Sequence, residues 1–329
     1  MSDRTATDRA NAAADRLLDY FLPRSGRWRT PTGEAWQPAL AVETIINGYR
    51  RTGRPALRDV VERSFQRYRG RRSHFYDDDG WYLGTWLHAF EATGDARYLA
   101  EARALFADLT IGWDATFGGG IWWNRDRTYK NAISNGLFLL GAARLARLLP
   151  AEPAYAGWAA AARAWFDHSG MINDVGLVND GLDGAGRNNG GTAWTYNQGV
   201  VIAAQVELVA ATGDRAPLST AARIADATLA SLVDADGILT EPCGPDGCDG
   251  DQQIFKGVLA RGLGALYRAD PAGGPRYRRF LERNAASVWR TARDQRGGLA
   301  LSWTGPAGGD NLATQVSAGL LLDEVALLG

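Results

Sequence analysis

The sequence predicts an all-α protein, an (α/α)6 barrel of about six helical hairpins. Three features of the chain lead to this fold class. Apolar residues recur at helical spacing along almost the whole chain. Short connections between the periodic segments alternate with long ones. No shift in composition marks a domain boundary, so we expect one (α/α)6-barrel domain over residues 1–329.

The expected helices are the segments with a period of about 3.6 residues, and there are about twelve of them. The first, at the N-terminus, is amphipathic and rich in Asp and Arg. In chain order the segments cover residues 7–22, 36–51, 56–69, 80–93, 96–109, 131–148, 153–167, 197–212, 216–232, 252–269, 276–293 and 311–327.

The short connections have a recurring pattern in which a glycine ends one helix and the next helix starts at once. "RTGRPAL" begins at residue 51, "ATGDARYL" at 92 and "ATGDRAPL" at 211. Helices joined so closely pack antiparallel. The long connections, 110–130, 170–195, 233–251 and 294–310, are rich in Gly and Trp. We therefore expect function on the barrel end that carries the long loops.

The composition excludes several classes of function. A net charge of -1 over 329 residues removes the electrostatic drive toward nucleic acid or an anionic membrane. No apolar run reaches membrane-spanning length. The N-terminus lacks the apolar core of a signal peptide, so we expect a cytoplasmic protein as written, or a secreted one if a leader was removed. The chain has 12 Trp, 11 Tyr and 10 Phe, and such aromatic faces also suit sugar rings.

Two cysteines, Cys243 and Cys248, are the only ones in the sequence. They could close a small disulfide loop, or remain as thiols in a reducing compartment, and the compartment argument favours thiols. Two thiols without a nearby His leave a zinc shell incomplete. We therefore expect no metal and no other cofactor.

Four polar and aromatic stretches precede helices at the long-loop end. The structural interpretation of each is capping of a helix start. Together they pool carboxylates, amides, cations and indoles, which suits a carbohydrate groove. We expect these side chains to gather in one groove: Asp77, Asp78, Asp79 and Trp81; Trp122, Trp123, Asn124, Lys130 and Asn131; Tyr196, Asn197 and Gln198; Asp251, Gln252 and Lys256.

The four stretches resemble glycoside hydrolase family 76, the endo-α-1,6-mannanase family, from about residue 36 to the end. The motifs that carry the resemblance are "YDDDGW", "GGGIWWN…YKNAISNG", "TYNQG" and "GDQQIFKG". The family implies an (α/α)6 barrel and cleavage of α-1,6-linked mannosides. Aligned on Trp81, it implies that Asp77 is the nucleophile and Asp78 the acid/base, while Asp79 occupies a variable position.

An adjacent carboxylate pair fits a retaining mechanism, which needs two carboxyl groups roughly 5–5.5 Å apart. One pKa of the pair should rise, and the resemblance puts the acid at Asp78. The alternatives are a transglycosylase, a hydrolase of another α-glycoside on this scaffold, and a non-catalytic mannan-binding paralogue. An isomerase would need paired His bases, and the chain has 3 His in all. We expect a monomer that acts on an α-mannoside oligo- or polysaccharide.

Overall fold

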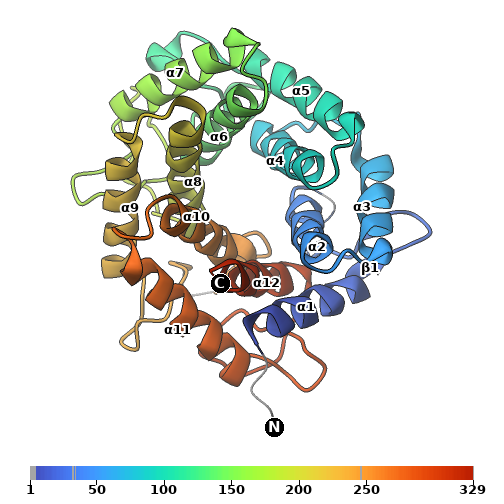
Figure 1. Cartoon of the computed structure of the whole chain (residues 1–329). Coiled ribbons are helices and arrows are strands. Elements are labelled where there is room, and N and C mark those ends of the chain that lie inside the picture. Colours follow the sequence, from blue (N-terminus) through green and yellow to red (C-terminus); the bar gives the residue numbers. More distant parts are fainter. Residues whose placement is uncertain (1–4, 32, 34, 245–246, 329) are drawn as a thin grey trace. The chain divides into compact units, whose positions relative to one another are not determined.

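The computed structural model describes residues 5–31, 33, 35–244 and 247–328 (Figure 1). Twelve α-helices lie in this part of the chain, as the periodicity predicts. Their bounds are α1 (Ala6–Leu17), α2 (Gln37–Thr52), α3 (Pro55–Tyr68), α4 (Tyr76–Thr93), α5 (Ala96–Ile111), α6 (Ala132–Leu148), α7 (Pro153–His168), α8 (Thr195–Thr212), α9 (Pro217–Ser231), α10 (Phe255–Ala269), α11 (Pro275–Thr291) and α12 (Leu312–Leu327).

Three short 3-10 helices and two strands complete the elements. The 3-10 helices are η1 (Leu18–Tyr20), η2 (Thr116–Gly118) and η3 (Gln252–Ile254). The strands β1 (Phe21–Leu22) and β2 (Arg27–Trp28) pair antiparallel. The expectation of a first helix reaching residue 22 is therefore wrong. The chain leaves the helix at Leu17, and the apolar residues beyond it belong to η1 and β1. None of the described helices is long and apolar enough to cross a bilayer.

The chain divides into two compact units. The first unit comprises Met1–Arg69, Glu91–Thr93 and Leu232–Gly329, and the second comprises Gly70–Phe90 and Gly94–Ser231. A single domain over the whole chain stays a prediction.

Each unit contains helices of two kinds. In the first unit α12 is buried without a break from Leu312 to Glu324, and it packs against α1, α2, α10 and α11. In the second unit α6 packs against α5, α7 and α8. Within this unit Figure 1 shows α5, α7 and α9 as a layer beside α4, α6 and α8. A helix that is apolar on every side belongs inside a core, whereas α3, α7, α9 and α11 bury one face only.

The short connections end helices in the way the sequence predicts. Gly53, Gly94 and Gly213 follow α2, α4 and α8 with φ of 64°, 71° and 75°. These values lie in the left-handed region, which glycine enters without a steric penalty from Cβ. The amide of each glycine donates to a carbonyl in the last turn of its helix. The next helix begins within four residues in all three cases.

The long connections after α5, α7, α9 and α11 share one design. Each folds back on itself through an isolated antiparallel bridge, namely Trp113 with Ile121, Ile172 with Val178, Val233 with Leu239 and Arg293 with Leu299. In each, the second bridge residue donates its backbone N–H to a buried helix amide. These amides, here called the pinning amides, are Asn135, Gln198, Asn284 and Gln315, at 2.8, 2.8, 2.9 and 3.0 Å. The position of each long loop is therefore set by a helix residue.

Candidate active site

The three consecutive aspartates form the first turn of α4, which begins at Tyr76, four residues earlier than the periodicity indicates. Phe75 takes the N-cap position but has no side chain that could cap the helix. Anionic side chains in a first turn are stabilised by the free N–H groups and the positive end of the helix dipole. The Tyr76 amide donates to the Trp123 carbonyl at 2.8 Å, which ties the helix start to the loop before α6.

Asp77 receives an N–H donor at each carboxylate oxygen. Trp123 Nε1 donates to Oδ2 at 3.0 Å, and the backbone amide of Asp78 donates to Oδ1 at 3.1 Å. The pKa of Asp77 is raised well above its ordinary value, first by burial and then by the charge of Asp78, while the two donors act in the opposite direction. Asp77 and Asp78 are therefore electrostatically coupled.

Asp78 has a different kind of partner. The Ser73 hydroxyl donates to Asp78 Oδ2 at 2.7 Å, and the same hydroxyl accepts the backbone N–H of Phe75 at 3.1 Å. A hydroxyl both donates and accepts, whereas the partners of Asp77 only donate. The two neighbouring carboxylates therefore lie in chemically distinct surroundings.

Asp79 turns away into the protein and is 3% exposed. Its two carboxylate oxygens accept the Ser73 amide at 2.9 and 3.2 Å, and Arg125 lies at 3.2 Å from Oδ2. Burial raises the pKa of Asp79 to about 7, against the lowering effects of the Ser73 amide and Arg125. Arg125 also bonds Asp108 at 2.6 Å. A substrate-binding role for Asp79 stays a prediction, and the contacts found are with the protein's own groups.

The two neighbouring indoles of the second stretch face different partners. Trp123 donates to Asp77 and packs on Phe75, with ring centroids 4.6 Å apart. Trp122, 9% exposed, donates through Nε1 to Asp114 at 2.7 Å. Trp123 therefore belongs to the surroundings of the carboxylate pair, and Trp122 belongs to those of Asp114.

The remaining polar residues of this stretch hold the loop together. Lys130 is 1% exposed, and its ammonium donates to Asp114 at 2.9 Å and to the carbonyls of Thr116 and Gly119 at 2.7 and 2.6 Å. Burial lowers the pKa of Lys130, and the bond to Asp114 opposes that change. Asn124 bonds Thr128. Asn131 caps α6 by accepting the Ser134 amide at 3.2 Å. A role of these three side chains in binding substrate stays a prediction.

In the third stretch, Asn197 lies close to a carboxylate that the sequence does not single out, Asp180. Asn197 is 1% exposed, and neither atom of its amide has a partner of hydrogen-bonding geometry in the described structure. Burial raises the pKa of Asp180, and the neighbouring Tyr129 hydroxyl and Asn197 amide oppose that rise. Tyr129 donates to Asp180 at 2.8 Å, and its ring lies 6.4 Å from that of Trp123. Contacts thus run from Asp77 through Trp123 and Tyr129 to Asp180.

Two other candidates in this unit, Gln198 and Trp81, are buried. The Gln198 side chain is 0% exposed and bonds both the N–H and the carbonyl of Val178, as one of the pinning amides. Trp81 is 3% exposed within α4. Tyr196, by contrast, is half-buried at the start of α8. Substrate contacts of these three residues stay predictions.

The fourth stretch belongs to the first unit, so its place beside the carboxylate pair stays a prediction. Asp251 accepts Trp36 Nε1 at 3.0 Å and Gln37 Nε2 at 3.2 Å. Gln252 accepts the Asp249 amide at 3.1 Å. The Lys256 ammonium donates to the Leu301 carbonyl at 2.8 Å and lies 4.6 Å from the centroid of the Trp303 ring. Burial lowers the pKa of Lys256 to about 8.

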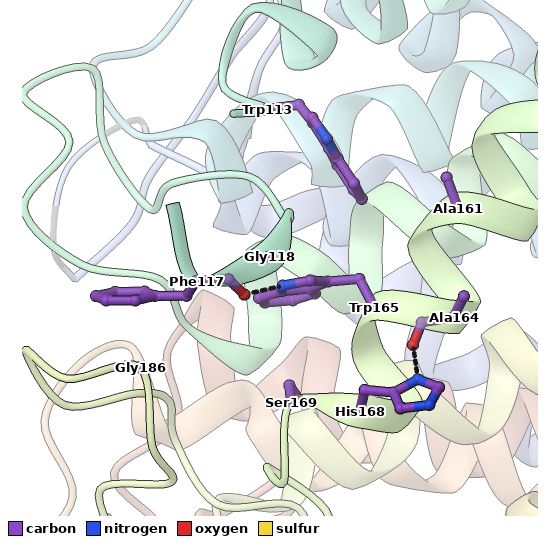
Figure 2. Close-up of a pocket in the computed structure, with 9 residues that line it drawn as sticks. All are labelled: Trp113, Phe117, Gly118, Ala161, Ala164, Trp165, His168, Ser169 and Gly186. Carbon is purple, nitrogen blue, oxygen red and sulfur yellow. Dashed lines mark hydrogen bonds between the residues drawn. The ribbon is translucent and has the colours of Figure 1, made fainter. Parts of the chain in front are cut away.

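Aromatic residues of the loop after α5 and of α7 line a pocket. The pocket of about 400 Å³ is lined by Trp113, Phe117, Gly118, Ala161, Ala164, Trp165, His168, Ser169 and Gly186 (Figure 2). Trp165 Nε1 donates to the Phe117 carbonyl at 2.9 Å across it. Neither Asp77 nor Asp78 is among its lining residues. Figure 2 shows the His168 ring turned back onto the Ala164 carbonyl of its own helix.

Cys243 and Cys248 form a disulfide, with Cα atoms 5.1 Å apart. The structure therefore differs from the expectation of free thiols, which rested on a reducing compartment. The bridge closes the loop that leads to η3. No group of three His, Cys, Asp or Glu side chains in the described ranges could hold a metal ion.

An all-α fold in which coupled carboxylates open a helix beside an indole is an arrangement suited to a glycoside hydrolase. The chain belongs to glycosyl hydrolase family 76, whose family model matches residues 5–324. The (α/α)6 barrel predicted from the periodicity is the fold of this family and is confirmed.

Known relatives support this assignment. A putative mannan endo-1,6-alpha-mannosidase of Schizosaccharomyces pombe is 29% identical over 298 residues, which are 82% of this chain and 66% of the relative. The chain thus spans slightly less than two thirds of that relative. The alpha-1,6-mannanase GH76A from Salegentibacter sp. HEL1_6 has a TM-score of 0.87 at 26% identity, over 99% of this chain and 100% of that chain. The structure of an inactive variant of that mannanase, in which two consecutive aspartates are replaced by alanine, contains alpha-1,6-mannotetrose. Its TM-score to this chain is 0.88 at 26% identity, with the same coverage.

Proposed function

We propose that this protein is a retaining glycoside hydrolase that cleaves α-1,6-linked mannosides at internal bonds of the sugar chain. The observation that carries the proposal is the coupled pair Asp77 and Asp78 at the start of α4. The names of the fungal and bacterial relatives supply the substrate class. The loss of activity that accompanies replacement of two consecutive aspartates in the Salegentibacter mannanase supports a catalytic role for such a pair.

In the first step, Asp77 attacks the anomeric carbon as a carboxylate, and the bond from that carbon to the glycosidic oxygen breaks. Asp78 gives its proton to the departing oxygen, so the leaving sugar departs as a neutral alcohol. In the second step, the Asp78 carboxylate takes a proton from water as the water attacks the same carbon. The ester to Asp77 breaks, the sugar is released, and both carboxyl groups return to their starting states.

The different partners of the two carboxylates support these roles. Asp77 is bonded only by N–H donors, from Trp123 and from the Asp78 backbone, and such donors stabilise an ionised carboxylate. Asp78 is bonded by the Ser73 hydroxyl, which suits a group that must exist with and without a proton.

Burial and the charge of Asp78 raise the pKa of Asp77, whereas the sequence argument expects the raised pKa on the acid, Asp78. Protons leave a coupled pair in steps that belong to the pair rather than to one residue. The raised pKa therefore means that one proton stays on the pair to a higher pH than a lone carboxyl would hold it. We infer that Asp78 holds this proton when substrate binds, because the two N–H donors oppose a proton on Asp77.

The proposal is tested by incubating the purified protein with α-1,6-, α-1,2- and α-1,3-linked mannotetraoses and analysing products over time. We expect cleavage of the α-1,6 substrate to shorter mannosides, with products of internal cleavage appearing first. Longer products than the substrate would indicate transglycosylation. Binding of the α-1,6-tetraose without any product would contradict the proposal and favour a mannan-binding paralogue.

A further inference from the structure

Ser73, in the connection before α4, is held at every polar group it has. Its backbone N–H donates to both oxygens of Asp79, at 2.9 and 3.2 Å. Its carbonyl accepts Arg125 Nε at 2.7 Å. Its hydroxyl accepts the Phe75 amide at 3.1 Å and donates to Asp78 at 2.7 Å. Ser73 is thus held through its backbone as well as through its hydroxyl.

The groups that hold Ser73 are themselves fixed. Arg125 bonds Asp79 at 3.2 Å and Asp108 at 2.6 Å, and its guanidinium lies 4.8 Å from the centroid of the Tyr76 ring. Asp79 is 3% exposed. A buried carboxylate paired with an arginine that has a second acidic partner is a rigid support. The Ser73 backbone is therefore held in place, and the bond from the Phe75 amide orients its hydroxyl toward Asp78.

We propose that Ser73 is the positioning residue of the acid/base carboxylate Asp78, and that Asp79 and Arg125 serve the reaction by holding Ser73. This inference rests on the proposed function, because it concerns the same reaction. It also assigns a purpose to the third aspartate of the run. Asp79 holds the backbone of the residue that orients Asp78.

The chemistry of a hydroxyl explains why a serine suits this place. A hydroxyl has one donor and two acceptor positions. While Asp78 is ionised, the Ser73 hydroxyl donates to it, as observed at 2.7 Å. While Asp78 is protonated, the hydroxyl oxygen accepts from it, with the Phe75 amide on the other acceptor position. The partner thus serves both protonation states through which the acid/base must pass, and it keeps the carboxyl group in one orientation.

The kinetic test compares Ser73→Ala with Ser73→Thr, which keeps the hydroxyl, and with Ser169→Ala, which removes a hydroxyl that bonds only the backbone of its own helix end. The substrates are α-1,6-mannotetraose and a 2,4-dinitrophenyl α-1,6-mannobioside. Dinitrophenolate departs without a proton, so its kcat/KM reports attack by Asp77 alone. We expect Ser73→Ala to lower kcat/KM about tenfold or more for the tetraose, because the variant removes a hydrogen bond to a charged carboxylate that must keep its orientation.

For the dinitrophenyl substrate we expect a less than threefold change. Ser73→Thr should restore most of the activity on the tetraose, and Ser169→Ala should match the wild type on both substrates. An equal loss on both substrates would overturn the proposal, because it would mean general damage to the site. Failure of Ser73→Thr to exceed Ser73→Ala would overturn it as well.

A crystal structure of Ser73→Ala separates this inference from the proposed function. We expect the Asp78 carboxyl group to leave its position or to occupy more than one rotamer, while Asp77 stays bonded to Trp123. An unchanged Asp78 would overturn the inference even if the enzyme cleaves mannosides. A wild-type protein that cleaves none of the α-mannosides would refute the proposed function, and the crystallographic result would still decide whether Ser73 positions Asp78.

Discussion

The buried carboxylate of Asp79 leads to a quantitative prediction about the pH dependence of stability. Its pKa of about 7 in the folded protein exceeds the ordinary value of 3.8. Below pH 3.8 both the folded and the unfolded chain bind this proton, and between about pH 4 and pH 7 only the folded chain binds it. The free energy of unfolding therefore falls as pH rises through this window, and the contribution of the proton is lost above about pH 7.

The magnitude follows from the two pKa values. At about 1.4 kcal/mol per pH unit, and with the proton half released at pH 7, the wild type loses about 2 kcal/mol of this contribution between pH 5 and pH 7. Asp79→Asn removes the titration while keeping an oxygen that can accept the Ser73 amide. We therefore expect the variant to be close to the wild type in stability at pH 5 and to gain on it as pH rises to 7.

The measurement is urea unfolding of the wild type and Asp79→Asn at pH 5, 6, 7 and 8. Because other buried carboxylates titrate too, the informative quantity is the difference between variant and wild type. Asp236→Asn is the matched control, since Asp236 is exposed in the loop after α9. A difference that stays constant with pH for Asp79→Asn, as we expect for the control, would refute the burial argument.

Four other outcomes are expected. Asp77→Asn and Asp78→Asn should each lower turnover of α-1,6-mannotetraose by about a thousandfold with unchanged circular dichroism, while Asp79→Asn costs much less; near-normal rates for either of the first two would remove the pair from the mechanism. Proton NMR of the first-formed product should show the α-anomer, whereas a β-anomer would mean inversion. Reduction of Cys243–Cys248 should expose two thiols and leave activity in place, because the proposed reaction uses neither cysteine; loss of activity that returns on reoxidation would contradict this. EDTA should not affect turnover, and inactivation reversed by a divalent cation would show that a metal takes part.

The fold was predictable from the sequence because the signals that start and end helices lie in short stretches of neighbouring residues. Helical period identifies all twelve helices, and the glycines at 53, 94 and 213 mark where three of them end. The apolar period places the start of α4 too late, because the three aspartates interrupt that period although they belong to the helix. Asp79 can be buried in the first turn of the helix because the Ser73 amide and Arg125, from other parts of the chain, bond its carboxylate.

The site was predictable only in part, because its contacts are tertiary. Asp77, Asp78 and Trp123 follow from the motif, but Ser73 and Arg125 join them only when the loop before α6 closes on the start of α4. A polar residue at a helix start also has several possible uses that the sequence does not distinguish. Gln198 holds a loop and Asn131 caps a helix, while Asn197 has a buried amide with no partner in the described chain.

The pinning amides have a consequence for how such a protein can diversify. Each accepts a hydrogen bond from the backbone N–H of a loop residue rather than from a side chain, so the bond does not depend on which side chain the loop has there. The attachment of each loop therefore constrains the backbone at one residue and leaves the choice of side chain there open. Replacement of the segments between these anchors is accordingly a practical way to alter a long loop while its backbone attachment to the helix is kept.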